Sequence, residues 1–359
     1  MDVLTRAKEL IEAARQGEED DTLRPRQDAL LHAWETGSEA GQADAVAAMS
    51  AAIEDPSIDP GSGAVLAITA GALVEGGADT SIVGTALLER LPAILTMAKR
   101  FQDACVADLS ADADEDDESA VEIFDHMVPL EHVRTHARDD VEGALAWQGL
   151  DRWALPTIAC LTRDPKLRGV ARSRPQLRRL AYETQGYNGF LTMALDILDD
   201  ETLVVLHPAT AQGYEVTISG VAVNFDLHVL LADLLIREEP DGLPGQRPNP
   251  IAVRNILGQD VQGDLTVVGP WNLHDWRALQ SDGTLAEDSD FWIWNEGRPA
   301  DIPTFEGQRV VLIGPPPYSR SWHGQRTFGG LCPDVTLRRT LDASAVRAWM
   351  AKLSSAPRS

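Results

Sequence analysis

The spacing of apolar residues changes near residue 202, from a helical period to a period of two. Before this point apolar residues recur every three or four positions, as in residues 4–14. After it, residues 203–206 form a short apolar run, and residues 214–220 alternate polar with apolar side chains as a half-buried strand does. The sequence therefore predicts an α+β protein, with an all-helical region at 1–200 followed by a mixed α+β domain at 201–359.

Within the helical region, short loops rich in Gly, Asp and Pro separate the apolar segments. Asp79 opens a helix that runs through Arg100, with a kink expected at Pro92. Further helices are expected at residues 153–161 and 173–197. Helices of this length, joined by short loops, favour a bundle or an irregular helical array, and no fixed repeat supports a solenoid.

The second region contains more expected strands than helices. The two runs near residues 203 and 214 predict a hairpin, and Asn224 is expected to cap a helix over residues 225–237. The remaining elements expected are strands at 265–268, 291–294 and 309–313, and a closing helix at 343–353. This order favours an α+β domain over a wound βαβ series.

Charge is distributed unevenly along the 359 residues. Residues 1–145 contain 31 Asp and Glu against 10 Lys and Arg, a net charge of −21, whereas residues 151–180 contain 8 basic against 2 acidic residues, a net charge of +6. The net charge of −25 argues against nucleic-acid or anionic-membrane partners. The basic belt at 151–180 is expected to dock on the acidic helices, and phosphate or RNA binding is the alternative.

Cysteine use and hydropathy indicate a cytoplasmic protein. The three cysteines are far apart and form no CxxC pair, which argues against a disulfide framework or a thiolate zinc site. The longest apolar stretch, residues 63–74, is too short for a spanning helix, and the N-terminus has no signal-peptide pattern.

Two polar segments, the acidic run at residues 110–120 and the histidines of residues 126–136, resemble sites, but neither is predicted to be one. The acidic run at residues 110–120 is expected to be a mobile, solvated loop because like charges repel. His126, His132 and His136 could chelate a metal together with Asp125 and Glu131, but no HExxH or ExxH pattern is present. The prediction is that the protein has no metal and no cofactor, and the alternative of a metal site at these histidines stays open.

His228 is the strongest single candidate for a catalytic group. It lies in the first turn of the expected helix and toward its buried face. The positive end of the helix dipole disfavours imidazolium there, so the ring should be neutral near pH 7 and could act as a base. A hydrogen-bonded core histidine explains the same pattern.

Aromatic residues concentrate after residue 270, where six of the nine tryptophans lie. Several adjoin polar groups, which is typical of small-molecule and peptide pockets, although tryptophan could also simply fill a loop-rich core. The expected ligand-binding residues are Asn224, Trp271, His274, Trp294, Tyr318 and His323.

The sequence thus favours a pocket in the second domain, lined by aromatic and histidine side chains, for a small molecule or peptide. Cofactor-independent catalysis there is a hypothesis that no motif supports or excludes. The alternative is a non-catalytic acidic protein, an adaptor or inhibitor, that binds a basic partner protein through its helical surface.

Overall fold

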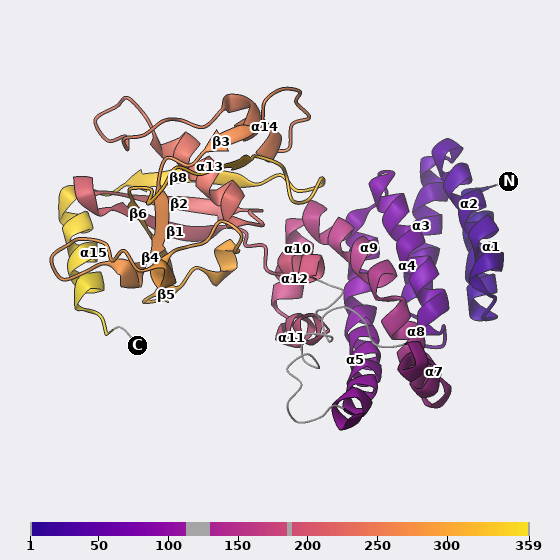
Figure 1. The fold of residues 1–359 in the computed structure, drawn as a ribbon. Coiled ribbons are helices and arrows are strands. Elements are labelled where there is room, and N and C mark those ends of the chain that lie inside the picture. Colours follow the sequence, from indigo (N-terminus) through magenta and orange to yellow (C-terminus); the bar gives the residue numbers. More distant parts are fainter. Residues whose placement is uncertain (1, 113–129, 185–188, 358–359) are drawn as a thin grey trace. The chain divides into compact units, whose positions relative to one another are not determined.

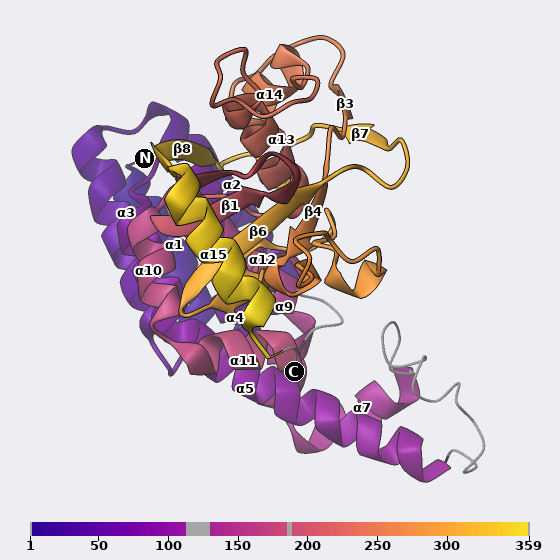
Figure 2. The ribbon, with the colours of Figure 1, turned by 90° about the vertical axis from the view of Figure 1, so that its left-hand side faces the viewer.

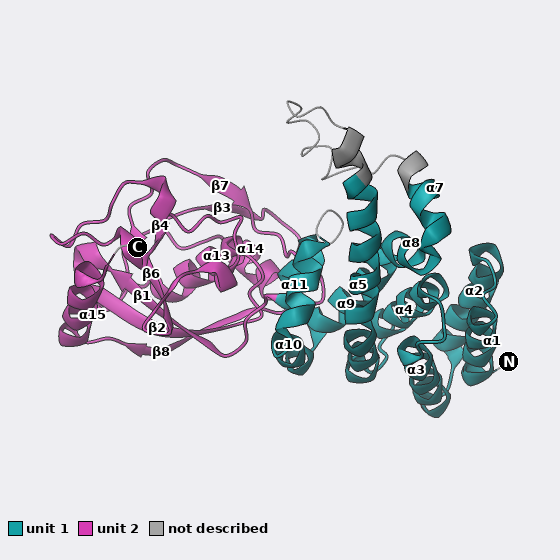
Figure 3. Ribbon diagram, turned by 90° about the horizontal axis from the view of Figure 1, so that it is seen from below, with its two compact units in different colours: residues 1–195 teal, residues 196–359 magenta. Residues whose placement is uncertain are grey.

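The chain forms two compact units, Met1–Leu195 and Asp196–Ser359 (Figure 3). The computed structural model describes residues 2–112, 130–184 and 189–357. Most of the acidic run, together with Asp125 and His126, lies outside the described residues, as do the side chains of Glu131 and His132.

Unit 1 is entirely helical in its described part (Figure 1). Its helices are α1 (Val3–Arg15), α2 (Asp20–Thr36), α3 (Glu39–Glu54), α4 (Pro60–Glu75), α5 (Thr80–Asp112), α7 (Leu130–Asp139), α8 (Val141–Gln148), α9 (Leu150–Arg163), α10 (Pro165–Arg172), α11 (Pro175–Glu183) and α12 (Gly189–Leu195).

The central helix of unit 1 is α4, which is apolar around its whole circumference and contacts α2, α3, α8 and α9. Small residues let its neighbours approach closely. A Cβ at Gly71 would lie 2.6 Å from Cβ of Pro156 on α9, so this crossing requires glycine. The indole of the buried Trp153 donates a hydrogen bond to the carbonyl of Pro60 at 3.1 Å, which ties α9 to the start of α4.

Helix α5 continues through Pro92 and ends at Asp112, so the first three residues of the expected acidic loop are helical. The Asp79 carboxylate accepts from the backbone N–H of Ser81 at 2.8 Å, as expected for a cap. In the described part of the chain, residues 80–107 are the one stretch of helix long and apolar enough to cross a membrane, and half of its most apolar window is buried inside the protein. Core helices of soluble proteins share this property.

The helix predicted over residues 173–197 is wrong as a single element. It is divided into α11, which ends at Glu183, and α12, which begins at Gly189. The Thr184 hydroxyl donates back to the Leu180 carbonyl at 2.9 Å at the end of α11, where a side-chain donor competes with continuation of the helix.

Two arginines of the basic belt pair with the acidic helices, in the manner expected. Arg152 lies 2.7 Å from the carboxylate of Asp20, and Arg174 pairs with Glu89. Because the carboxylates are exposed, each pair contributes at most about 1 kcal/mol. The buried Arg168 instead donates to the carbonyl of Leu161 at 2.8 Å.

Unit 2 is built on a six-stranded sheet, and the predicted α+β class is confirmed. Its strand order is β4-β6-β1-β2-β8, with β5 also paired to β6, and β1–β6 is its only parallel pair among the described strands. The elements of unit 2 are β1 (Glu201–His207), β2 (Gln212–Ser219), α13 (Asn224–Leu235), α14 (Pro250–Ile256), β3 (Thr266–Val268), β4 (Asn272–Asp275), β5 (Thr304–Phe305), β6 (Gln308–Gly314), β7 (Ser321–His323), β8 (Asp334–Thr340) and α15 (Ala343–Ser355).

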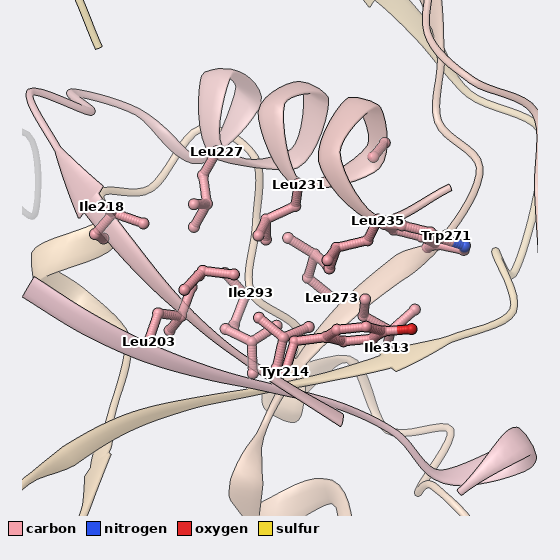
Figure 4. Close-up of a cluster of buried hydrophobic side chains, with 14 of the residues drawn as sticks. Leu203, Tyr214, Ile218, Leu227, Leu231, Leu235, Trp271, Leu273, Ile293 and Ile313 are labelled. Carbon is pink, nitrogen blue, oxygen red and sulfur yellow. The ribbon is translucent and has the colours of Figure 1, made fainter. Parts of the chain in front are cut away.

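Each face of this sheet carries its own helix and core. Alternate residues of β1 and β6 point to opposite faces, so Val205 and Val311 pack beneath α13, whereas Leu206 and Leu312 pack beneath α15. Figure 4 shows the first core, with the leucines of α13 above the strands. Figure 2 shows α15 lying across the other face.

Two sequence predictions near α13 need correction. The helix begins at Asn224 rather than after it, and Asn224 does not cap it with its side chain. Residues 291–294 are not a strand, because a 3₁₀ turn ends at Phe291 and only Trp292 bridges to β4. The residues just after this segment cap α13 with main-chain carbonyls, since the N–H groups of Asn224 and Phe225 donate at 2.9 Å to the carbonyls of Gly297 and Asn295, respectively.

Candidate functional site

A cleft of about 600 Å³ lies on the α15 side of the sheet, at the carboxyl ends of β1 and β6. It is framed by three segments far apart in sequence, which follow β1, include β4 and its following loop, and follow β6. The residues that line it are Pro208, Ala209, Asn272, His274, Gly283, Thr284, Leu285, Ala286, Glu287, Trp292, Ile313, Gly314, Pro315, Pro316 and Pro317.

Gly314, the last residue of β6, leaves room in the wall of the cleft. A Cβ at this position would lie 2.8 Å from Cδ1 of Leu285 and 3.1 Å from Nε2 of His274. Both distances are below ordinary van der Waals contact, so any larger residue would push these two walls apart or fill the space between them.

His274 and Asn272 are buried polar side chains of the cleft wall, and His274 is 5% exposed. Its Nε2 lies 3.2 Å from Nδ2 of Asn272, and Oδ1 of Asn272 accepts from Nη2 of Arg320 at 2.9 Å. Because the amide oxygen of Asn272 accepts a hydrogen bond from Arg320, it is the amide nitrogen that faces His274 and donates to it. Nε2 is therefore an acceptor, and the proton of the neutral ring resides on Nδ1.

The Nδ1–H donor of His274 has no hydrogen-bond partner within the protein. A buried donor without a partner costs about 1–3 kcal/mol, so native structures rarely retain one without a reason. Burial also lowers the pKa of His274 to about 4, against the opposing effect of Asp275, so the ring is neutral at pH 7. The cleft wall thus holds an unsatisfied, uncharged donor.

Three aromatic rings lie side by side at the cleft. Trp292, which lines it, has its ring centroid 5.4 Å from that of Trp294 and 6.4 Å from that of Tyr318. Trp294 is 48% exposed and Tyr318 is 52% exposed, so this pair of predicted site residues presents aromatic surface to solvent. Such rings offer flat contact area for an apolar or cationic ligand.

His228 lies in a different place, inside the core on the α13 side. It is fully buried, its ring is parallel to that of Trp271 at 6.4 Å, and Trp322 lies 5.2 Å away at an angle. Its Nδ1 is 3.3 Å from Oδ1 of Asn295, while Nε2 has no partner. Burial lowers the pKa of His228 to about 4, so the ring is neutral as expected, with burial rather than the helix dipole as the principal cause.

The structure does not bring the three candidate histidines together. Leu273 of β4 points into the α13 core, so its neighbours Asn272 and His274 face the other side of the sheet from His228. His323 is exposed on β7 and lines a separate hollow of about 260 Å³ with Trp322. His228 lines neither of these two hollows, and its catalytic role remains a prediction.

Asn224 lies next to the aromatic segment rather than in the cleft. Its amide nitrogen donates to the carbonyl of Trp294 at 2.9 Å, and its Oδ1 is buried without a partner. It therefore fixes the backbone that carries Trp294, which is a structural link between α13 and the aromatic residues beside the cleft.

Sequence reasoning missed Asn272, Trp292, Gly314 and Arg320 as contributors to this site. Only the alternation of polar residues with Leu273 in the stretch Asn272–Asp275 could have indicated a strand at a sheet edge. Among the residues that the structure describes, no group of three His, Cys, Asp or Glu side chains is placed to hold a metal ion.

Unit 2 is thus a two-faced α+β sheet with a histidine-containing cleft at one end. Comparisons of the chain with protein-family models, with curated proteins and with solved structures give no match.

Proposed function

We propose that unit 2 is a binding unit for a small organic molecule, and that the cleft beside His274 is where the molecule binds. The observation that carries this proposal is a cleft of about 600 Å³ lined by His274, a buried side chain whose Nδ1–H has no partner. This volume is within the usual range of small-molecule sites, which combine apolar walls with a few placed polar groups.

The ligand would supply the missing acceptor. A carbonyl or hydroxyl oxygen that bonds to Nδ1–H after a small rotation of the ring would recover the cost of the unpaired donor. Leu285 and the ring of Trp292 would cover the apolar part of the same molecule. Arg320, acting through Asn272, would keep the histidine in the tautomer that donates.

The proposal is binding rather than turnover. A nucleophile needs a base within hydrogen-bonding distance. The one hydroxyl among the lining residues, that of Thr284, donates to Asp282 at 2.6 Å within its own turn. Such a short-range contact is typical of turn stabilisation.

The test is a screen of small polar fragments against the full chain by ligand-observed NMR, repeated with Gly314→Leu. The leucine side chain would fill the cleft between Leu285 and His274, so fragments that bind there should lose binding. Gly329→Leu is the matched control, because a Cβ at Gly329 meets no atom within 4 Å.

Circular dichroism establishes that both variants are folded. Fragment binding that survives in folded Gly314→Leu, or that is lost equally in Gly329→Leu, would refute the cleft as the site. His274→Phe adds a second readout, since it keeps the ring volume and removes the donor.

A further inference from the structure

We infer that the ligand of this cleft is an organic cation, a molecule that carries an ammonium group on an apolar or aromatic body. This inference rests on the proposed function and adds the charge class of the ligand. Three features of the cleft argue for it independently: the charges around it, the backbone of its proline wall, and its aromatic surface.

Negative charge surrounds one wall of the cleft. Glu287 lines it, and the stretch 278–297, of which residues 283–287 and Trp292 line the cleft, contains five carboxylates and no Lys or Arg. The carboxylates are Asp282, Glu287, Asp288, Asp290 and Glu296. A concave surface lined with one sign of charge concentrates the opposite ion, so this wall attracts cations and repels anions.

No compensating positive charge lines the cleft. His274 is the basic side chain among the lining residues, and it is uncharged at pH 7 because burial lowers its pKa to about 4. Arg320 acts electrostatically on His274, and its Nη2 donates to Asn272 and to the carbonyl of Trp271 at 3.1 Å. Glu296 acts electrostatically on the same guanidinium, and so partly offsets its charge.

The opposite wall also disfavours anions. Pro315, Pro316 and Pro317 follow β6 directly and have no backbone N–H, so this stretch presents carbonyl oxygens and ring carbons only. Carboxylates and phosphates are usually held by N–H groups and by Arg or Lys. An ammonium group, in contrast, can donate to carbonyl oxygens and needs none of these.

The aromatic residues complete the argument. A cation within about 6 Å of a tryptophan ring is attracted by the ring quadrupole, and tryptophan is the best of the aromatic residues for this interaction. Trp292 lines the cleft, with Trp294 and Tyr318 packed beside it. Glu287 and Trp292 would thus bind the charged end, while the His274 donor binds an acceptor on the body of the molecule.

The experiment compares three probes of similar size and different charge: phenethylammonium, 2-phenylethanol and phenylacetate. Their affinities for the full chain are measured by calorimetric or NMR titration at pH 7 and low ionic strength, where charge effects are least screened. We expect the ammonium probe to bind about threefold to tenfold more tightly than the alcohol, with phenylacetate the weakest.

Charge variants make the result specific. Glu287→Gln should weaken phenethylammonium binding about threefold and leave 2-phenylethanol unchanged. Glu238→Gln removes the same charge from an exposed residue outside the cleft and should change neither affinity. Tightest binding by phenylacetate or by the alcohol would overturn the cation inference and leave the cleft as a binding site. Failure of all three probes to bind would overturn both.

Discussion

Nη2 of Arg320 lies 2.9 Å from Oδ1 of Asn272, and this contact determines which nitrogen of His274 carries the proton. Since the amide oxygen is occupied by Arg320, only the amide nitrogen can face the ring. Arg320 thus fixes the orientation of the Asn272 amide, and the amide in turn fixes the tautomer of His274.

Replacing Arg320 by Leu should release this constraint. Asn272 could then present either end to His274, so both tautomers should appear where the wild-type ring shows only the Nδ1–H form. Long-range ¹H–¹⁵N correlation spectra of the histidine side chains measure the tautomer directly. Arg326→Leu, which removes a guanidinium paired with Asp260, should leave the His274 signals unchanged. A wild-type spectrum with the proton on Nε2 would contradict the hydrogen-bond assignment.

Gly314→Ala should destabilise the protein by about 1–3 kcal/mol, because the added methyl group overlaps Leu285 and the ring of His274. At an open position such as Gly329, which lies in a turn, the same substitution would be neutral or mildly stabilising, since alanine has the smaller conformational entropy to lose. Urea denaturation of Gly314→Ala and Gly329→Ala compares the two cases. If the two variants have equal free energies of unfolding, Leu285 and His274 can move to accommodate the added methyl group without a loss of stability.

His228 should contribute stability that depends on pH. Its pKa is about 4 in the folded protein and about 6.5 in an unfolded chain, so the unfolded state binds the additional proton between these values. The contribution is therefore complete above pH 6.5 and is lost as the pH falls toward 4, by about 3 kcal/mol at most. His274 acts in the same direction.

His228→Gln should reduce this slope, measured as the free energy of unfolding against pH. It should also lower stability at pH 7 while leaving ligand binding in the cleft intact, since the two rings face opposite sides of the sheet. Loss of binding in a folded His228→Gln protein would instead assign His228 to the functional site, as the sequence suggested.

Asp226 should act in the opposite direction. It is buried in the first turn of α13, and desolvation raises its pKa to about 7, compared with 3.8 in an exposed carboxyl group. The unfolded chain releases this proton first, so the contribution of Asp226 falls as the pH rises from about 4 to 7, by about 4 kcal/mol at most. Asp226→Asn should therefore be more stable than wild type at pH 8, and the two should converge near pH 4. Thermal unfolding at these two pH values tests it, and a variant less stable at pH 8 would show that the carboxylate has a stabilising partner.

The sequence predicted those elements whose apolar pattern is local. Residues 203–206 and 310–313 are continuous apolar runs that lie in the interior strands β1 and β6, while the leucines expected in a helix over residues 225–237 lie in α13. It failed where tertiary contacts override a local pattern. The alternating aromatics of residues 291–294 resemble a strand, yet only Trp292 bridges to β4, and the carbonyls of Asn295 and Gly297 that follow cap α13.

The candidate site was predictable only in its residue types. His274, Trp294 and Tyr318 were expected to bind a ligand, and they lie in or beside the cleft. The sequence could not show whether His274 lies near His228, because this depends on which face of the sheet His274 points to from β4. The role of Gly314 depends on Leu285, 29 positions away, which approaches it only in the folded sheet.

The parallel pairing of β1 with β6 has a consequence for how unit 2 folds. The hairpin β1–β2 can form early because its strands are adjacent, but 100 residues separate His207 from Gln308, and the chain between them includes α13, α14 and β4. Closing a loop of this length costs about 4 kcal/mol of chain entropy before any contact compensates for it. Insertion of β6 should therefore be a late and slow step, and until it occurs the apolar edge of β1 is open to other chains. The cleft, which needs the end of β6, exists only after that step, so ligand binding would report on completed folding.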